Sequence, residues 1–235
     1  MNGVPRAMVW VGGVSAVLLA LGTWQVAVSG VFVSADWDFH LWAQAHLPAG
    51  GWKWLLDAFA SVTGERLFTL PVLFLSGGWL ALRGRDWRPL VSVVAGLAVI
   101  AVVGYSIKFG LGRTMPYTGM DVLHGGGRAW PSGHVANATY TWAMAGILLI
   151  GERGLWPRRA WFAPWMVASA LVALACGWVM ARVDYHWISD IPGGWVLGLL
   201  ALAVSVTVLH RGLPIPMRAP WALRLRGRLF TEPVR

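Results

Sequence analysis

Two histidines in this 235-residue sequence lie in runs that are suited to chemistry. The first run is Trp130-Pro131-Ser132-Gly133-His134, in which Pro, Ser and Gly are residues that favour the start of a helix. A helix N-terminus presents free backbone N–H groups and the positive end of the helix dipole, so it can bind an anion. His134 in the first turn could then donate a proton to a leaving group. By itself, the run also fits an ordinary helix cap with a surface histidine.

The second histidine, His186, lies midway between Arg182 and Asp190 in steps of four residues. If this stretch is helical, the spacing places all three side chains on one face. Asp190 could then orient and activate His186, while Arg182 offered a bidentate phosphate donor. Gly194 and Gly198 continue the row and would let a neighbouring helix approach closely. The alternative is an ion pair that anchors the end of a membrane span. Arg, His and Asp together are rare at a membrane boundary, however, and this favours a functional site.

A third group of polar residues lies in the run 108–116, where Lys108 and Arg113 flank a glycine-rich turn. Two cations beside flexible backbone could hold an anion, although a snorkelling lysine next to a turn is an equally simple interpretation. Arg128, in the loop that begins at His124, could supply a further donor.

The apolar runs around these residues predict the elements that must position them. Hydrophobic residues make up 57% of the chain and charged residues 12%, against about 25% in an ordinary soluble domain. The composition therefore predicts an all-α, polytopic membrane protein that forms a single domain over residues 1–235. Residues 34–64 mix acids, His and Trp, which is typical of an amphipathic segment at the membrane interface between spans one and two. Six transmembrane helices are expected, at about residues 7–33, 65–82, 89–110, 134–151, 160–181 and 188–209.

The distribution of charge predicts the orientation of these spans. The termini and the loops at 83–88 and 152–159 hold 13 Lys and Arg and 3 acids, whereas the other side holds 6 and 7. We therefore expect both termini, including a basic tail at about 211–235, to be cytoplasmic, and the candidate site to face outward. The expected location is the bacterial inner (plasma) membrane. The basic residues lie beside apolar spans, so the net charge of +9 does not indicate nucleic-acid binding.

The three groups of residues, in this order and on one membrane face, resemble the type 2 phosphatidic acid phosphatase superfamily of membrane lipid phosphatases. That family carries the motifs Lys-x6-Arg-Pro, Pro-Ser-Gly-His and Ser-Arg-x5-His-x3-Asp. The second motif matches fully at 131–134, and the end of the third matches at 186–190.

This sequence departs from the family pattern at the arginines. Met115 stands at the arginine position of the first motif, and Arg113 lies two residues earlier. In the third motif Ala181 replaces the serine, and three residues instead of five separate Arg182 from His186. These departures predict a phosphate pocket of altered shape.

The resemblance implies a phosphatase mechanism without a metal or another cofactor. His186 would attack the phosphorus and form a phosphohistidine, Asp190 would orient His186, and His134 would protonate the leaving oxygen. Water would then release the phosphate. The groups implied to bind the non-bridging phosphate oxygens are Lys108, Arg113, Arg182 and the backbone amides of Ser132 and Gly133.

The expected substrate is a lipid phosphate whose tails stay among the membrane lipids. Phosphatidic acid, phosphatidylglycerol phosphate, an isoprenyl phosphate or diphosphate, and a phosphorylated glycolipid all fit an outer-face site. Two alternatives remain open from the sequence. One is a lipid phosphotransferase of the same superfamily, and the other is an inactive relative that binds a lipid phosphate.

Overall fold

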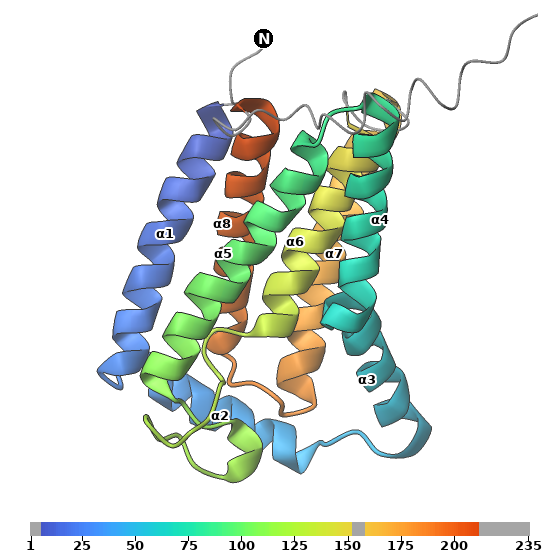
Figure 1. Ribbon diagram of the computed structural model, residues 1–235. Coiled ribbons are helices and arrows are strands. Elements are labelled where there is room, and N and C mark those ends of the chain that lie inside the picture. Colours follow the sequence, from blue (N-terminus) through green and yellow to red (C-terminus); the bar gives the residue numbers. More distant parts are fainter. Residues whose placement is uncertain (1–5, 152–157, 212–235) are drawn as a thin grey trace, which may run out of the picture.

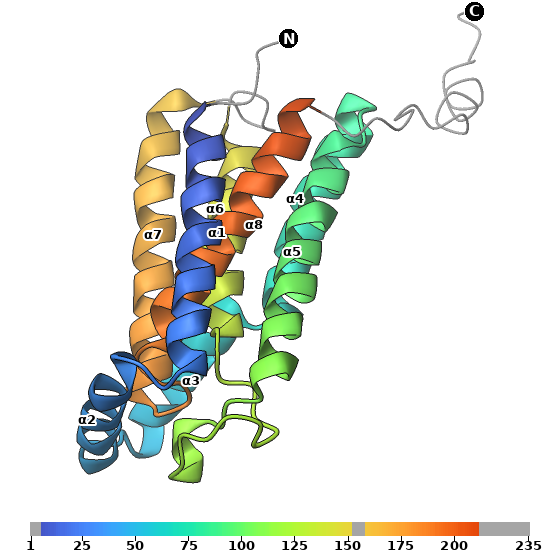
Figure 2. The same cartoon turned by 90° about the vertical axis from the view of Figure 1, so that its left-hand side faces the viewer.

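The computed structural model describes residues 6–151 and 158–211, and within these ranges every regular element is a helix. The long helices stand side by side as a bundle, and α2 lies across its lower end (Figures 1 and 2). In chain order the elements are α1 Arg6–Ala27, α2 Phe32–Ala45, α3 Gly50–Gly64, α4 Arg66–Gly84, α5 Arg88–Leu111, η1 Pro116–Thr118, α6 Gly133–Leu149, α7 Arg159–Arg182 and α8 Asp190–Arg211.

Several of these helices are long and apolar enough to cross a membrane. The stretches at 6–27, 50–84, 88–118, 160–182 and 190–211 meet this description among the residues searched. α6 has 17 residues, which corresponds to about 26 Å and lies at the short end of the range for a span. Crossing by α6, and therefore the sixth span, stays a prediction.

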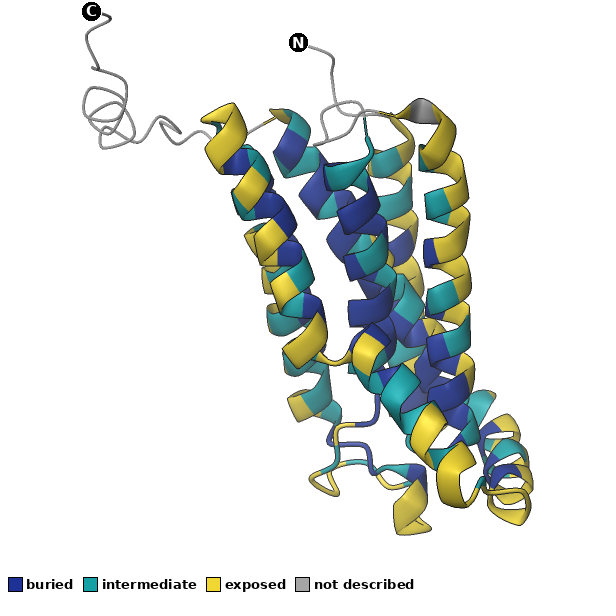
Figure 3. Cartoon of the chain, turned by 90° about the vertical axis from the view of Figure 1, so that its right-hand side faces the viewer, coloured by how far each residue is buried: buried dark blue, intermediate teal, exposed yellow. Residues whose placement is uncertain are grey.

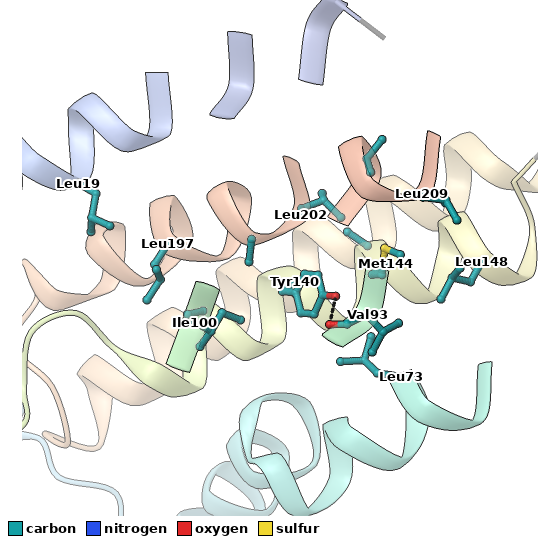
Figure 4. Packing of buried hydrophobic residues seen from close by; sticks show 14 residues of the cluster. Leu19, Leu73, Val93, Ile100, Tyr140, Met144, Leu148, Leu197, Leu202 and Leu209 are labelled. Carbon is teal, nitrogen blue, oxygen red and sulfur yellow. Dashed lines mark hydrogen bonds between the residues drawn. The ribbon is translucent and has the colours of Figure 1, made fainter. Parts of the chain in front are cut away.

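Buried and exposed side chains are sorted as a membrane bundle requires. Exposed residues lie on the outer faces of the helices and buried ones face the interior (Figure 3). The exposed set is rich in large apolar side chains such as Trp10, Leu75 and Val102. Inside, the Tyr140 hydroxyl donates to the Val93 carbonyl at 3.0 Å amid a cluster of Leu, Val and Met (Figure 4). This arrangement satisfies the one polar group of a large core residue.

Residues 34–64 differ from the single interfacial segment that the sequence predicts. Only α2 lies across the end of the bundle, whereas α3 packs against α6 and α7 and runs into α4. The contact with α6 needs Gly64, because a Cβ there would lie 2.6 Å from the His134 carbonyl oxygen. The break between α3 and α4 leaves carbonyls without helical partners, and Asn137 of α6 donates to that of Gly64 at 3.0 Å.

The close approach of α8 to α6 follows the glycine row that continues from Asp190. A Cβ on Gly194 would lie 2.7 Å from the Ser132 carbonyl oxygen, and one on Gly198 would lie 2.6 Å from Cβ of Thr139. Both distances are shorter than real Cβ contacts allow. The sequence prediction of a close helix contact is therefore confirmed, and it fixes the start of α8 against the start of α6.

The two ends of the bundle carry different parts of the chain. α1 begins and α8 ends at the upper end of Figure 1, whereas the segments 112–132 and 183–189 lie with α2 at the lower end. The predicted grouping of these segments at one end is confirmed. The tail at 212–235 and the loop at 152–157 lie outside the described residues.

We expect Gly198→Val to destabilise the bundle by about 1–3 kcal/mol, because the added methyl groups overpack the contact between α6 and α8. Thermal unfolding of the purified protein in detergent measures the change. Gly78→Val is the matched control, since a Cβ on this helical glycine of α4 would meet no atom within 4 Å. Equal melting temperatures for the two variants would contradict the prediction.

Candidate active site

A pocket of about 510 Å³ opens at the lower end of the bundle, where the predicted site residues lie. Its wall includes Lys108 of α5, Gly133 and His134 of α6, and His186 from the turn before α8. The other lining residues are Gly64, Glu65, Arg66, Leu67, Ile100, Gly104, Tyr105, Met115, Tyr117, Arg128, Asn137, Met180, Tyr185 and Leu197.

The start of α6 contributes backbone N–H groups to this pocket. Ser132 is the N-cap residue, but its side chain does not cap the helix, and its buried Oγ has no hydrogen-bond partner among the described residues. The first-turn amides are therefore not occupied by the usual capping oxygen. Lys108 passes beside them, since its Cε lies 4.0 Å from the position of a Cβ on Gly133. The arrangement joins a cation to a helix N-terminus, as anion binding requires.

His186 and Asp190 form a buried pair behind the pocket wall. Nδ1 of His186 lies 3.1 Å from Oδ2 of Asp190, and the Asp190 side chain is fully buried. The same oxygen accepts the backbone N–H of Trp187 at 3.0 Å. An ionised carboxylate only accepts hydrogen bonds, so beside an ionised Asp190 the Nδ1 atom would carry the ring proton and Nε2 would keep its lone pair. Burial lowers the pKa of His186 while Asp190 opposes that shift, and the neutral ring is therefore favoured.

The stretch 182–190 is not one helix, so Arg182 does not stack with His186. α7 ends at Arg182, and Asp184 takes a left-handed backbone with φ of 60°. His40 and Gln44 of α2 bind the two carboxylate oxygens of Asp184 at 2.9 and 2.5 Å and hold this turn.

Arg182 lies outside the pocket, against α2. Its guanidinium stands 5.2 Å from the ring of Trp42 and donates to the His46 carbonyl. Its predicted role in binding the substrate phosphate therefore has no support from its position.

Arg113 is buried beside Asp190 of the His186–Asp190 pair, where acidic groups surround it. Its Nε and NH2 donate to Asp121 at 2.8 and 2.7 Å, and NH2 also donates to Asp36 at 2.6 Å. NH1 donates to Ser189 at 3.0 Å and to Oδ1 of Asp190 at 2.9 Å. All five N–H groups are engaged, so in this structure Arg113 orients Asp190 and has no donor left for a phosphate.

Two of the three carboxylates around Arg113 belong to segments that carry no motif. Asp36 comes from α2 and receives the backbone N–H and the hydroxyl of Ser189 at 2.8 and 2.7 Å. Burial raises the pKa of Asp36, and the neighbouring Arg113 opposes this shift. Sequence reasoning missed Asp36 and Asp121, because Asp36 lies beside Asp38 in a segment of mixed composition and Asp121 lies in a polar, glycine-rich loop.

The comparisons with known proteins agree with this geometry. The family model described as the PAP2 superfamily matches residues 87–213. The chain belongs to the PAP2 superfamily. The predicted resemblance to type 2 phosphatidic acid phosphatases, which are integral membrane phosphatases, is thereby confirmed.

A solved structure shares the PAP2 fold of this chain. It is a transmembrane PAP2 type phosphatidylglycerolphosphate phosphatase from Bacillus subtilis. The TM-score is 0.66 and the identity 19%, and the match covers 80% of this chain and 92% of the other. The curated proteins gave no match.

Met115 stands at the arginine position of the first motif. In the third motif, counting back from His186 with five intervening residues places the arginine position at Met180, whereas alignment from Ala181 places it at Arg182. Both methionines line the pocket. The cations that do line it are Lys108, Arg66 and Arg128. Of these, Arg66 at the start of α4 was not singled out from the sequence, although it is one of only six cations on that side.

We expect Arg113→Met to lower the free energy of unfolding by about 3–5 kcal/mol, because it leaves buried carboxylates without their cation. Thermal unfolding in detergent at neutral pH measures this loss. Arg182→Met is the matched control, since it removes a guanidinium from the same end of the bundle without stranding a buried carboxylate. A smaller loss for Arg113→Met than for the control would contradict this role.

Proposed function

We propose that this PAP2 protein removes the phosphate from a membrane lipid phosphate through a phosphohistidine intermediate. The observation that carries the proposal is the buried His186–Asp190 pair, which opens on a pocket that also holds His134 and three cations. An oriented neutral histidine facing a cationic pocket suits nucleophilic attack on a phosphate ester.

The reaction follows from the placement of the two histidines. Nε2 of His186 attacks the phosphorus, and the bond from phosphorus to the ester oxygen breaks. The leaving oxygen takes the electron pair of that bond and a proton from His134. Asp190 stabilises the positive charge that develops on the His186 ring. In the second half, water gives a proton to His134 and attacks the phosphorus, so that inorganic phosphate leaves and His186 is restored.

Charge neutralisation on the phosphate is assigned to the pocket itself. Lys108, Gly133 and His134 line the pocket, and we assign the Lys108 ammonium and the first-turn amides of α6 to the non-bridging oxygens. Phosphoryl transfer depends mainly on positioning and on such neutralisation. The proposed mechanism therefore needs no metal or other cofactor.

The pocket suits a lipid substrate because its wall combines polar and apolar groups. In addition to the polar residues, the pocket wall contains apolar groups, including Ile100, Gly104 and Leu197. A headgroup can thus lie among charges while the tail stays among apolar side chains. The fold is shared with a phosphatidylglycerolphosphate phosphatase, so phosphatidylglycerol phosphate is the first substrate to test, followed by phosphatidic acid and isoprenyl diphosphate.

We place the pocket end on the outer face of the membrane. The opposite end carries Arg6, Arg83, Arg85, Arg88, Arg158 and Arg211, which is the bias expected of a cytoplasmic side. Both termini are then cytoplasmic and α6 makes the sixth crossing.

We expect the purified protein to release inorganic phosphate from at least one member of this lipid panel with magnesium chelated. His186→Ala should abolish release because no nucleophile remains. His134→Asn should slow it by about 10²–10⁴-fold for an alkyl phosphate, and much less for an aryl phosphate, whose leaving group needs no proton.

Binding of the lipids without any turnover would reject catalysis and favour an inactive relative. Transfer of the phosphoryl group only when an acceptor lipid is added would favour a phosphotransferase.

We expect the ring of His186 to remain neutral at pH 6.5 and to gain a proton only at lower pH, because burial lowers its pKa from the ordinary value of 6.5. Histidine NMR of the protein in detergent measures this, and the signal that disappears in His186→Ala identifies the residue. Since the neutral ring is the nucleophile, activity should fall as the pH drops through this pKa. Titration of His186 at or above pH 6.5 would contradict the prediction.

A further inference from the structure

Three cations from separate parts of the chain meet at the pocket. Lys108 comes from α5, Arg66 from the start of α4 and Arg128 from the segment before α6. Among the described residues none of the three forms an ion pair, and Glu65, which also lines the pocket, bonds to neither arginine. Three like charges at the end of an apolar bundle repel one another unless an anion lies among them.

Aromatic side chains on one face of α5 hold the two arginines in place. Tyr105 and Phe109 are one turn apart, and their rings stack with centroids 5.8 Å apart. Arg66 lies over Tyr105 at 5.0 Å and donates to its hydroxyl at 2.9 Å, while Arg128 lies over Phe109 at 5.0 Å. Lys108, on the same face, donates to the Arg128 carbonyl. The three cations are thus positioned as a set.

Both guanidiniums keep donors for a ligand. Arg66 uses NH1 on the Tyr105 hydroxyl, which leaves Nε and NH2 without a bond in the described part of the chain. The Arg128 side chain makes no hydrogen bond to any described residue, and its guanidinium lies over the Phe109 ring. A guanidinium fork held on an aromatic ring is well suited to bidentate binding of phosphate oxygens.

The other arginines near the site are not available for this task. Arg113 donates every N–H to carboxylates or to Ser189, and Arg182 lies outside the pocket. Met115, at the arginine position of the first motif, and Met180, at that of the third when counted back from His186, line the pocket instead. A phosphate in this pocket can therefore meet guanidinium groups only from Arg66 and Arg128, within the part of the chain that is described.

We propose that Arg66 and Arg128, which lie outside the three motifs, are the phosphate-binding guanidiniums of this protein and take the place of the two motif arginines. The proposal rests on the proposed function for the identity of the ligand, a phosphate dianion. In this arrangement the guanidinium groups that bind phosphate come from α4 and from the segment before α6, and not from the motif positions.

The test measures phosphate binding directly, so that it does not depend on turnover. Inorganic phosphate should raise the melting temperature of the wild-type protein in detergent in a concentration-dependent way, because it binds the folded state. Arg66→Gln and Arg128→Gln should each weaken this binding by roughly tenfold or more, as expected for the loss of charge-assisted hydrogen bonds. Arg83→Gln, at the far end of α4 from Arg66, is the matched control and should bind phosphate as the wild type does.

A rescue variant separates a binding role from a structural one. Met115→Arg, added to the double variant Arg66→Gln/Arg128→Gln, should restore part of the phosphate affinity by returning a guanidinium to the motif position. Phosphate binding by the single variants that equals that of the wild type would overturn the proposal, as would a loss that Met115→Arg does not reduce. The proposed function is tested separately, by phosphate release from the lipid panel by the wild type and by the loss of that release in His186→Ala.

Discussion

A buried guanidinium surrounded by carboxylates holds together the end of the bundle that carries the pocket. Arg113 joins α2 through Asp36, its own segment through Asp121, and the start of α8 through Asp190. Taking these ions out of water is expensive, and the arrangement is stable only because each N–H has an acceptor. Arg113 therefore ties together three of the segments that surround His186.

The charge of this cluster also bears on catalysis. One guanidinium faces three carboxyl groups beside the His186 ring, so acidic groups outnumber basic ones in this cluster. A histidine that attacks phosphorus becomes positively charged, so a negative environment behind it favours the transition state over the neutral ground state. Arg113 donates to Asp190 and so offsets part of the cost of burying that carboxyl group. In this way a residue without a free donor still shapes the chemistry.

How far the sequence predicts the structure depends on the distance between interacting residues. Apolar runs located the long helices, and the glycine row at 194 and 198 predicted the contact of α8 with α6, because these signals are local. Two of the acids that pair with Arg113, namely Asp36 and Asp121, could not be predicted in the same way. Asp36 lies 77 residues from Arg113, and neither it nor Asp121 belongs to a motif. Arg66 was equally hidden, because only the fold brings the start of α4 to the pocket.

α2 illustrates how a correct local pattern can have an unexpected purpose. The mixed composition of 34–64 predicted an interfacial segment, and α2 does lie across the end of the bundle. Its polar residues Asp36, His40 and Gln44 are spaced by four and so share one face, but that face binds Ser189 and Asp184 of the turn that carries His186. The amphipathic pattern thus reports a contact with the site, because buried polar partners and water produce the same periodicity.

The pocket is electrostatically divided, and this division accounts for the unusual placement of its cations. Behind His186 lies the acidic cluster around Arg113, whereas Lys108, Arg66 and Arg128 line the pocket itself. A cation at Met180, directly on the His186 side, would oppose the positive charge that forms on the nucleophile. Cations carried by α4 and the segment before α6 can neutralise the phosphate from the far side instead. The phosphoryl group would then lie between two sides of the pocket. The cations would bind its negatively charged oxygens, and the acidic cluster would stabilise the positive charge that forms on His186.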